Sequence, residues 1–397
     1  MQILLNMKTK PRMCIYLLLL CVCATSCFRA NNGEKRSNVY ADSIGLVAEE
    51  VSIPPSDVLL LKSYPLSSSY RADSTLVVVG YNYKEHALDF IELNSKKTVQ
   101  LKLNQEGPSG ITRRIGGLYV HNLDSIWLCD DTQQAYLINS KGEMKNKIAL
   151  NDGESDGVVA VMANYAMSVI KLYYNERRQS LFYAVEIVVN DIPKLVVKER
   201  ALGQQKPIGS YELTPSVVEP NITVKDYGYI YRPNISFTGD LIVYNYPIES
   251  SVYTIDLNTG ARKTISGESK FTPNVVPKCI SAPTYEAREL FALENVCFHE
   301  IMHLSASDLY ARLHVSGVDT ADEKDPGKLN AGRKLLLTLF NRDFETVNEL
   351  ELPSCRYSYY TGWCALDEGI LIFVDNILSG SDASEELIFD VYRPVLK

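Results

Sequence analysis

The run Leu76-Val77-Val78-Val79-Gly80-Tyr81 is followed by a polar turn and then by Ala87-Leu88-Asp89-Phe90-Ile91-Glu92-Leu93. Both runs have the length and the β-branched and aromatic content of strands, and the turn residues Asn94-Ser95-Lys96 close the pair. The same layout returns with first residues at 126, 181, 241, 309 and 370. The chain is therefore built from an internal repeat of strand pairs, and this repeat decides the fold.

The six copies follow one another at similar intervals along the chain. A unit of about 40 to 50 residues with four strands is a propeller blade, which loops can lengthen. A further strand precedes the pairs, as in Gly117–His121, and would be the innermost. We predict an all-β, six-bladed β-propeller over residues 43–397, closed by an N-terminal strand within Ile44–Val51 that pairs with the last blade. A pair of β-sandwiches is the alternative, but six similar units argue against two dissimilar halves.

Several segments carry a family resemblance. The segments are Gln105–Ile111, Leu123–Ile126, Ile138–Gly142, Glu349–Pro353 and Glu385–Phe389. They resemble a family of uncharacterised bacterial lipoproteins, known only as a domain of unknown function, with a TolB-like six-bladed propeller. The resemblance spans most of the chain. It implies this fold and brings no activity, since its motifs are turns and strands.

The N-terminus has the pattern of an export signal. Basic residues precede a short apolar run, Met13–Cys23. This run is too short for a membrane span, which needs roughly 20 apolar residues, and is typical of a signal peptide. Ala24-Thr25-Ser26-Cys27 then resembles a lipobox, which implies cleavage before Cys27 and lipid on its thiol. We expect a signal peptide over 1–26, a flexible tether over 27–42, and a lipid-anchored protein of the cell envelope, at the outer membrane. An ordinary signal peptide with an incidental Cys27 is the alternative.

Charge and cysteine content limit the partners. The net charge is -8 and the pI is near 5.3. These values argue against nucleic acid, because phosphate binding needs a basic surface. Five cysteines follow Cys27, and none has the CxxC spacing of metal or redox sites. Cys355 and Cys364 could be bridged across a hairpin or could simply be buried. We expect no cofactor.

His299-Glu300-Ile301-Met302-His303 matches the motif H-E-x-x-H. On a helix, two histidines four residues apart can bind one zinc ion, and the glutamate can act as general base of a metallopeptidase. Thr284–Phe298, just upstream, has a helical pattern with Thr284 as a cap. However, a metzincin-type third ligand is missing, and Glu323, the gluzincin-type candidate, lies in a loop-like segment.

The repeat places the same motif differently. Aligning Ser307-Asp308-Leu309 with Asp124-Ser125-Ile126 puts Ile301–Leu304 on the innermost strand of the fifth blade. On a straight strand, His299 and His303 would lie about 13 Å apart, at roughly 3.3 Å per residue. That separation is too large for two ligands of one zinc ion, each bonded at about 2 Å. We therefore favour the strand and a module without a metal site.

The leading functional hypothesis is a non-catalytic binding or scaffold module for a glycan, peptide or protein. Propellers present loops and channel mouths on a rigid disc. His121, Arg232 and His303 lie on or near predicted inner strands and are our candidate channel-mouth residues, and Tyr173-Tyr174 is an aromatic pair nearby. The zinc peptidase remains the enzyme alternative. The sequence does not identify the ligand, an activity, the oligomeric state or the side of the membrane.

Overall fold

The computed structural model describes residues 44–396, except 151–156, 165–166, 191, 216–223, 229, 280–283, 324, 359–361 and 380–384. All of these belong to one compact unit, Ala41–Lys397. The expected signal peptide, Cys27 and the tether lie outside the described residues. Within the described part, no helix is long and apolar enough to span a bilayer.

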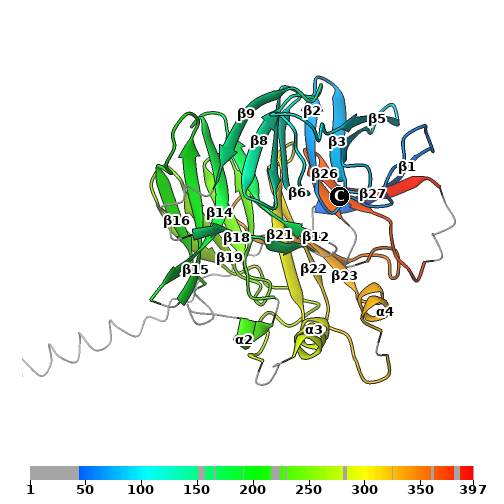
Figure 1. Ribbon diagram of the computed structural model, residues 1–397. Coiled ribbons are helices and arrows are strands. Elements are labelled where there is room, and N and C mark those ends of the chain that lie inside the picture. Colours follow the sequence, from blue (N-terminus) through cyan, green and yellow to red (C-terminus); the bar gives the residue numbers. More distant parts are fainter. Residues whose placement is uncertain are drawn as a thin grey trace, which may run out of the picture. The chain divides into compact units, whose positions relative to one another are not determined.

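Six antiparallel meanders form the six predicted blades. Each begins with its innermost strand, and the ribbon arranges the blades around one axis (Figure 1). The first blade is β2 (Ser67–Ala72), β3 (Thr75–Asn82), β4 (Ala87–Glu92) and β5 (Lys97–Lys102). The second is β6 (Ile115–Asn122), β7 (Ser125–Asp130), β8 (Gln134–Ile138) and β9 (Met144–Ala149). The third is β13 (Leu172–Asn175), β14 (Ser180–Val189), β15 (Ile192–Ala201) and β16 (Gly209–Leu213), with β10 (Gly157–Val159) added beside β14.

The fourth blade is β17 (Asn234–Thr238), β18 (Leu241–Asn245), β19 (Val252–Asp256) and β20 (Arg262–Ile265). The fifth is β21 (Cys297–Leu304), β22 (Leu309–Val315), β23 (Leu335–Phe340) and β24 (Thr346–Glu351). The sixth is β25 (Trp363–Leu366), β26 (Gly369–Phe373), β27 (Leu387–Leu396) and β1 (Ile44–Ile53). A small hairpin, β11 (Met162–Asn164) with β12 (Met167–Val169), and the helices α2 (Val224–Tyr227), α3 (Tyr285–Glu294) and α4 (Pro326–Ala331) lie in the connections.

The N-terminal strand closes the ring, as predicted. β1 pairs antiparallel with β27 over ten positions, from Ile44 opposite Leu396 to Ile53 opposite Leu387. Ile53 is fully buried in a cluster shared with the first and last blades. The last blade therefore combines strands from both ends of the described chain, which leaves no open edge at the junction.

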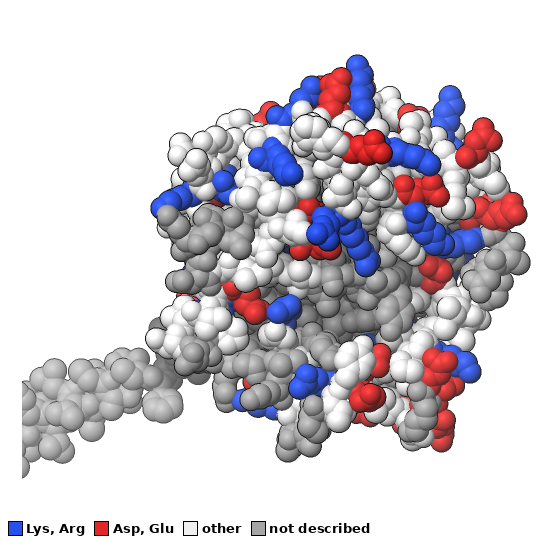
Figure 2. Space-filling view, viewed as in Figure 1, with Lys and Arg blue, Asp and Glu red and all other residues white. Residues whose placement is uncertain are grey.

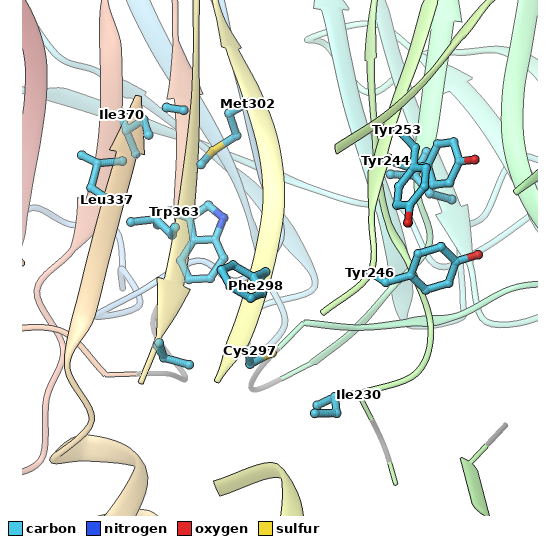
Figure 3. Close-up of a cluster of buried hydrophobic side chains, with 14 of the residues drawn as sticks. Ile230, Tyr244, Tyr246, Tyr253, Cys297, Phe298, Met302, Leu337, Trp363 and Ile370 are labelled. Atoms are coloured by element: carbon cyan, nitrogen blue, oxygen red, sulfur yellow. The ribbon is translucent and has the colours of Figure 1, made fainter. Parts of the chain in front are cut away.

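Burial follows from the stacking of blades face to face. Middle strands such as β22, β23 and β26 are buried at every position, whereas the outer strands β5 and β9 expose alternate residues. This is why the middle strands are continuous apolar runs. Figure 3 shows part of one core cluster, with Met302 of β21 and Trp363 of β25 near Phe298, and the stacked Tyr244 and Tyr253 (centroids 5.0 Å apart) beyond.

The surface carries both signs of charge. Figure 2 shows lysine and arginine interspersed with aspartate and glutamate over the visible face, with no field of a single sign. Some surface ion pairs join neighbouring blades, for example Arg71 with Asp367 at 2.8 Å. The cysteines of the described chain, including Cys355 and Cys364, are free thiols. The bridge that the sequence left open is therefore absent from this structure.

Candidate ligand site in the central channel

The six innermost strands surround a cavity of about 350 Å³. β2, β6, β13 (with Ile170 and Lys171 before it), β17, β21 and β25 all contribute to its lining. The volume lies within the roughly 300 to 1,000 Å³ typical of small-molecule sites. The cavity is the channel of the propeller, where ligands of this architecture have access to side chains from every blade.

Short polar side chains join the inner strands to one another. Ser67 Oγ donates to the carbonyl of Trp363 at 3.4 Å, and Ser69 Oγ donates to the carbonyl of Ala365 at 2.5 Å. A third such bond runs from Ser236 Oγ to the carbonyl of Ile301. The inner strands of adjacent blades form no ladder with each other. Serine hydroxyls therefore satisfy carbonyls on their channel side that would otherwise lack partners. The two bonds between β2 and β25 advance together along both strands, so these two inner strands run in the same direction, as a repeated blade requires of all six.

This common direction gives the channel two different ends. At the end where the inner strands finish, a tight hairpin turn leads to the second strand of each blade; we call it the hairpin end. At the other, the loop end, the chain enters each inner strand from the preceding blade. The helices α2, α3 and α4 lie together at the loop end (Figure 1).

A partly buried ion pair crosses the channel near the loop end. Lys171, just before β13, contacts Glu300 of β21, and so joins the third blade to the fifth across the fourth. Trp363 of β25 donates its indole N–H to Glu300 Oε1 at 3.3 Å. The two charged side chains are only 23% and 17% exposed, and both line the cavity. Three blades are therefore connected through the carboxylate of Glu300.

A β-bulge aims Glu300 at the channel. The pairing of β21 with β22 shifts between Phe298 and Ile301, where three steps on β21 face two on β22. A bulge inserts one residue and rotates the side chains beside it. Glu300 therefore lines the cavity while the neighbouring His299 is 4% exposed and packs against Trp363, with ring centroids 5.0 Å apart.

Aromatic rings form another part of the wall. Tyr173 stacks on Phe237 with centroids 5.0 Å apart, and Tyr119 meets Tyr173 edge-on at 5.3 Å. Burial raises the pKa of both tyrosines, so the phenols are neutral and can donate hydrogen bonds. Tyr173 already donates to the carbonyl of Gly239 at 3.2 Å. The predicted pair Tyr173-Tyr174 thus divides, since Tyr173 lines the cavity whereas Tyr174 packs in the core beside Trp127.

His303 lies toward the hairpin end of the same cavity. Its Nε2 is 3.2 Å from Asp308 Oδ1, and its ring packs on Tyr310 with centroids 4.8 Å apart. Nearby, Ser305 Oγ donates to Asp367 Oδ1 at 2.9 Å, and Asp367 also accepts from Arg71. The polar groups at this end are therefore paired with one another.

The other two predicted channel-mouth residues lie elsewhere. His121 is at the hairpin end of β6, where its Nε2 is 3.5 Å from Glu176 and its ring meets Tyr174. Arg232 precedes β17 at the loop end and lines a separate pocket of about 40 Å³, where it donates to Glu186 at 2.9 Å. His121 and Arg232 therefore lie at opposite ends of the channel, and the structure does not bring them together with His303. Of the three predicted residues, His303 lines the cavity.

The H-E-x-x-H segment is a strand, as the repeat predicted. The upstream helix is confirmed over Tyr285–Glu294, with Thr284 as its N-cap, whereas the last residues of the predicted helical segment, Cys297 and Phe298, belong to strand β21. Burial, then Arg333, lowers the pKa of His299 well below its ordinary value. Among the described residues, no three His, Cys, Asp or Glu side chains are placed to hold a metal ion. The motif therefore lacks the helical geometry of a zinc peptidase.

Lys171 and Trp363 are cavity residues that the sequence analysis missed. Lys171 is a single charge between the apolar Val169-Ile170 and Leu172, just before an inner strand. That isolation in an apolar run was a usable signal. Trp363 offered none, because tryptophan is common in strands that are simply buried.

Fold and channel together define a six-bladed β-propeller with a ligand-sized central cavity. Residues 43–351 match the family described as "Domain of unknown function (DUF4221)", and the chain belongs to this family. A search of the curated proteins finds no match. The chain is similar to a crystal structure of a DUF4221 member from Bacteroides vulgatus ATCC 8482, at TM-score 0.74 and 15% identity, over 90% of this chain and 100% of that one.

A second similar structure comes from Bacteroides fragilis NCTC 9343, from a protein whose name proposes that it is exported. The TM-score is 0.54 at 12% identity, and the match covers 89% of this chain and 95% of that one. At these identities the two structures establish the fold alone. They agree with the predicted propeller fold, and the family match over residues 43–351 confirms the resemblance to a domain of unknown function, whereas the lipid anchor stays a prediction.

Proposed function

We propose that this chain is a lipid-anchored envelope protein whose propeller binds a small ligand, a glycan or a peptide, in its central channel. The observation that carries the proposal is the cavity itself, which combines an ion pair, aromatic rings and hydroxyl groups from six different strands. Sites of this kind combine apolar walls with a few convergent polar groups. A scaffold for a protein partner is the broader form of the same hypothesis.

Binding accounts for the site better than catalysis does. The enzyme hypothesis rested on His299, Glu300 and His303, which lie in a strand and have separate partners: Trp363, Lys171 and Asp308. A general base needs a positioned reaction centre beside it, and a zinc site needs a shared face for its ligands. Glu300 instead serves as a fixed charge in the channel wall.

The lipobox supports the envelope location, and so does the exported character that the name of the Bacteroides fragilis protein proposes. Replacement of Cys27 by serine tests this part. We expect the chain made in its native host to fractionate with the outer membrane, and C27S to appear in the soluble fraction. If C27S and the parent chain fractionate alike, lipid on Cys27 is not the anchor.

The binding part is tested with tryptophan fluorescence. The chain has two tryptophans, of which Trp127 is fully buried between blades and Trp363 lines the cavity. A ligand in the channel should change the emission of Trp363, and this change should be absent in W363F. Envelope glycans and peptides are the probes. Tyr173→Ala should weaken binding, whereas Tyr83→Ala, at a 50% exposed turn, should not.

Two results would oppose the proposal. A fluorescence change that persists in W363F, together with an affinity that Y173A leaves unchanged, would place the ligand outside the channel. A screen in which no glycan or peptide binds, and no envelope protein is captured, would remove support for a binding module altogether.

A further inference from the structure

We infer that the ligand of the channel is a small zwitterion, namely an amino acid or a short peptide with a free ammonium and a free carboxylate group. This inference rests on the proposed function and specifies its ligand. It follows from the charge, the unused hydrogen-bonding capacity and the size of the cavity.

The cavity presents one cation and one anion side by side. Lys171 Nζ and the Glu300 carboxylate are in contact, and both side chains line the cavity. The pair joins two blades that are not neighbours, so its two charges lie within the channel rather than within one blade junction. A ligand that enters the cavity meets both charges at once.

Both groups have hydrogen-bonding capacity beyond the contacts described. An ammonium group has three donors, and Lys171 uses one on Glu300. A carboxylate has about four acceptor positions, and Glu300 receives Lys171 and the indole of Trp363. A ligand carboxylate can accept from Lys171 while a ligand ammonium donates to Glu300, and the existing pair need not break. Hydrogen bonds between ionised groups of this kind are about twice as strong as neutral ones.

Charge balance selects a ligand with both charges. The other ionisable groups of the lining have partners, since Asp367 pairs with Arg71 and His303 contacts Asp308. The two charges that remain available to a ligand, on Lys171 and Glu300, therefore sum to zero. A ligand with one net charge would satisfy Lys171 or Glu300 and oppose the other, and uncompensated charge is costly for groups that are partly removed from water.

Size and wall chemistry favour a peptide over a glycan. The cavity volume of about 350 Å³ is that of a site for a small molecule rather than for an oligosaccharide chain. Tyr119, Tyr173 and Phe237 present apolar surface, but each ring is partly covered by its neighbour. Such a wall suits an apolar side chain, whereas a sugar would need an open aromatic face.

The experiment compares matched probes by isothermal titration calorimetry on the purified chain. The probes are leucine, glycylleucine, N-acetyl-glycylleucine amide, which keeps the peptide backbone and side chain but lacks both charges, and a neutral disaccharide. We expect a zwitterionic probe to bind at least about tenfold more tightly than the blocked peptide, the effect of one hydrogen bond to a charged group.

Two substitutions locate the effect. Lys171→Met and Glu300→Gln should each weaken binding of glycylleucine by about tenfold to a hundredfold. The matched control is the exposed ion pair of Lys145 with Glu143, 3.0 Å apart on the outer edge of the second blade. K145M and E143Q should leave the affinity unchanged. If either channel variant fails to fold, the comparison of free with blocked peptide on the parent chain still decides the question.

The outcomes separate the two proposals. If the blocked peptide binds as tightly as glycylleucine, or the disaccharide binds and competes for the channel, the zwitterion inference is overturned and channel binding stands. If K171M and E300Q bind glycylleucine as the parent does, the ion pair is a structural brace and the inference is likewise overturned. If no probe here or in the wider screen binds, both proposals fail.

Discussion

His314 makes the propeller sensitive to acid. It is the last residue but one of β22, is 0% exposed, and stacks on Phe298 with centroids 5.1 Å apart. Burial, and then the charge of Arg312, lowers its pKa from 6.5 to about 3. Its Nε2 is 3.6 Å from Glu349 Oε1, beyond hydrogen-bond distance. The folded chain therefore holds this imidazole neutral at pH values where the unfolded chain binds a proton.

The sign and size follow from this difference. Between pH 6.5 and 3 the unfolded state binds the extra proton, so the free energy of unfolding falls as the pH falls. At about 1.36 kcal/mol per pH unit, this residue lowers the free energy of unfolding by about 3 kcal/mol between pH 7 and pH 4. His314→Phe keeps the stacked ring and removes the titration. Any cost of the larger ring, about 1 to 3 kcal/mol, is the same at both pH values.

The assay is urea unfolding at a series of pH values, followed by tryptophan fluorescence. The difference in unfolding free energy between the parent chain and H314F should change by about 3 kcal/mol in favour of H314F from pH 7 to pH 4. His314→Gln, which also lacks the titration and adds no volume, should behave likewise. Parallel pH curves for all three chains would refute the reasoning, because they would mean that His314 titrates alike in both states.

Three further predictions concern other parts of the molecule. Burial raises the pKa of Glu249 to about 7. The stabilisation that its protonation gives the folded chain is therefore fully present below pH 4.5 and is lost as the pH rises through 7. In urea titrations E249Q should remove this loss, which is at most about 3 kcal/mol. In the closing strand, Ile53→Ala should lower the unfolding free energy by about 2 to 5 kcal/mol. Val47, in the same strand, is 53% exposed. Val47→Ala should therefore change the unfolding free energy by no more than about 0.5 kcal/mol, and equal effects of the two substitutions would contradict the closure. Elemental analysis should find no stoichiometric zinc, and one zinc per chain that is lost in His303→Ala would contradict the strand interpretation.

The fold could be predicted because every blade repeats the same local pattern. The six predicted runs begin within one residue of β3, β7, β14, β18, β22 and β26. These middle strands are buried on both faces, and this burial requires the continuous apolar runs that the sequence shows. The closing strand was predictable from its position, since the strand-like run Ile44–Val51 precedes the first unit and could pair with the last blade.

The site was harder to predict because it depends on which residues the ring brings together. Lys171 and Glu300 are 129 residues apart, and neither has a local partner that marks it. His121 and Arg232 were selected because they are near inner strands. However, His121, near the end of its strand, lies at the hairpin end of the channel, whereas Arg232, which precedes its strand, lies at the loop end. Period and propensity identify the strand without stating which of its residues reach the cavity.

The H-E-x-x-H segment shows how strongly context determines the chemistry of a motif. On a helix, residues four apart share a face and could share one ligand. On β21, the bulge beside Phe298 leaves His299 in the core, turns Glu300 into the channel and leaves His303 toward the hairpin end. What differs between the helical and the strand arrangement is therefore the partner of the Glu300 carboxylate. On β21 that partner is the ammonium group of Lys171, and the remaining acceptor positions of the carboxylate are those proposed for the ammonium group of a ligand.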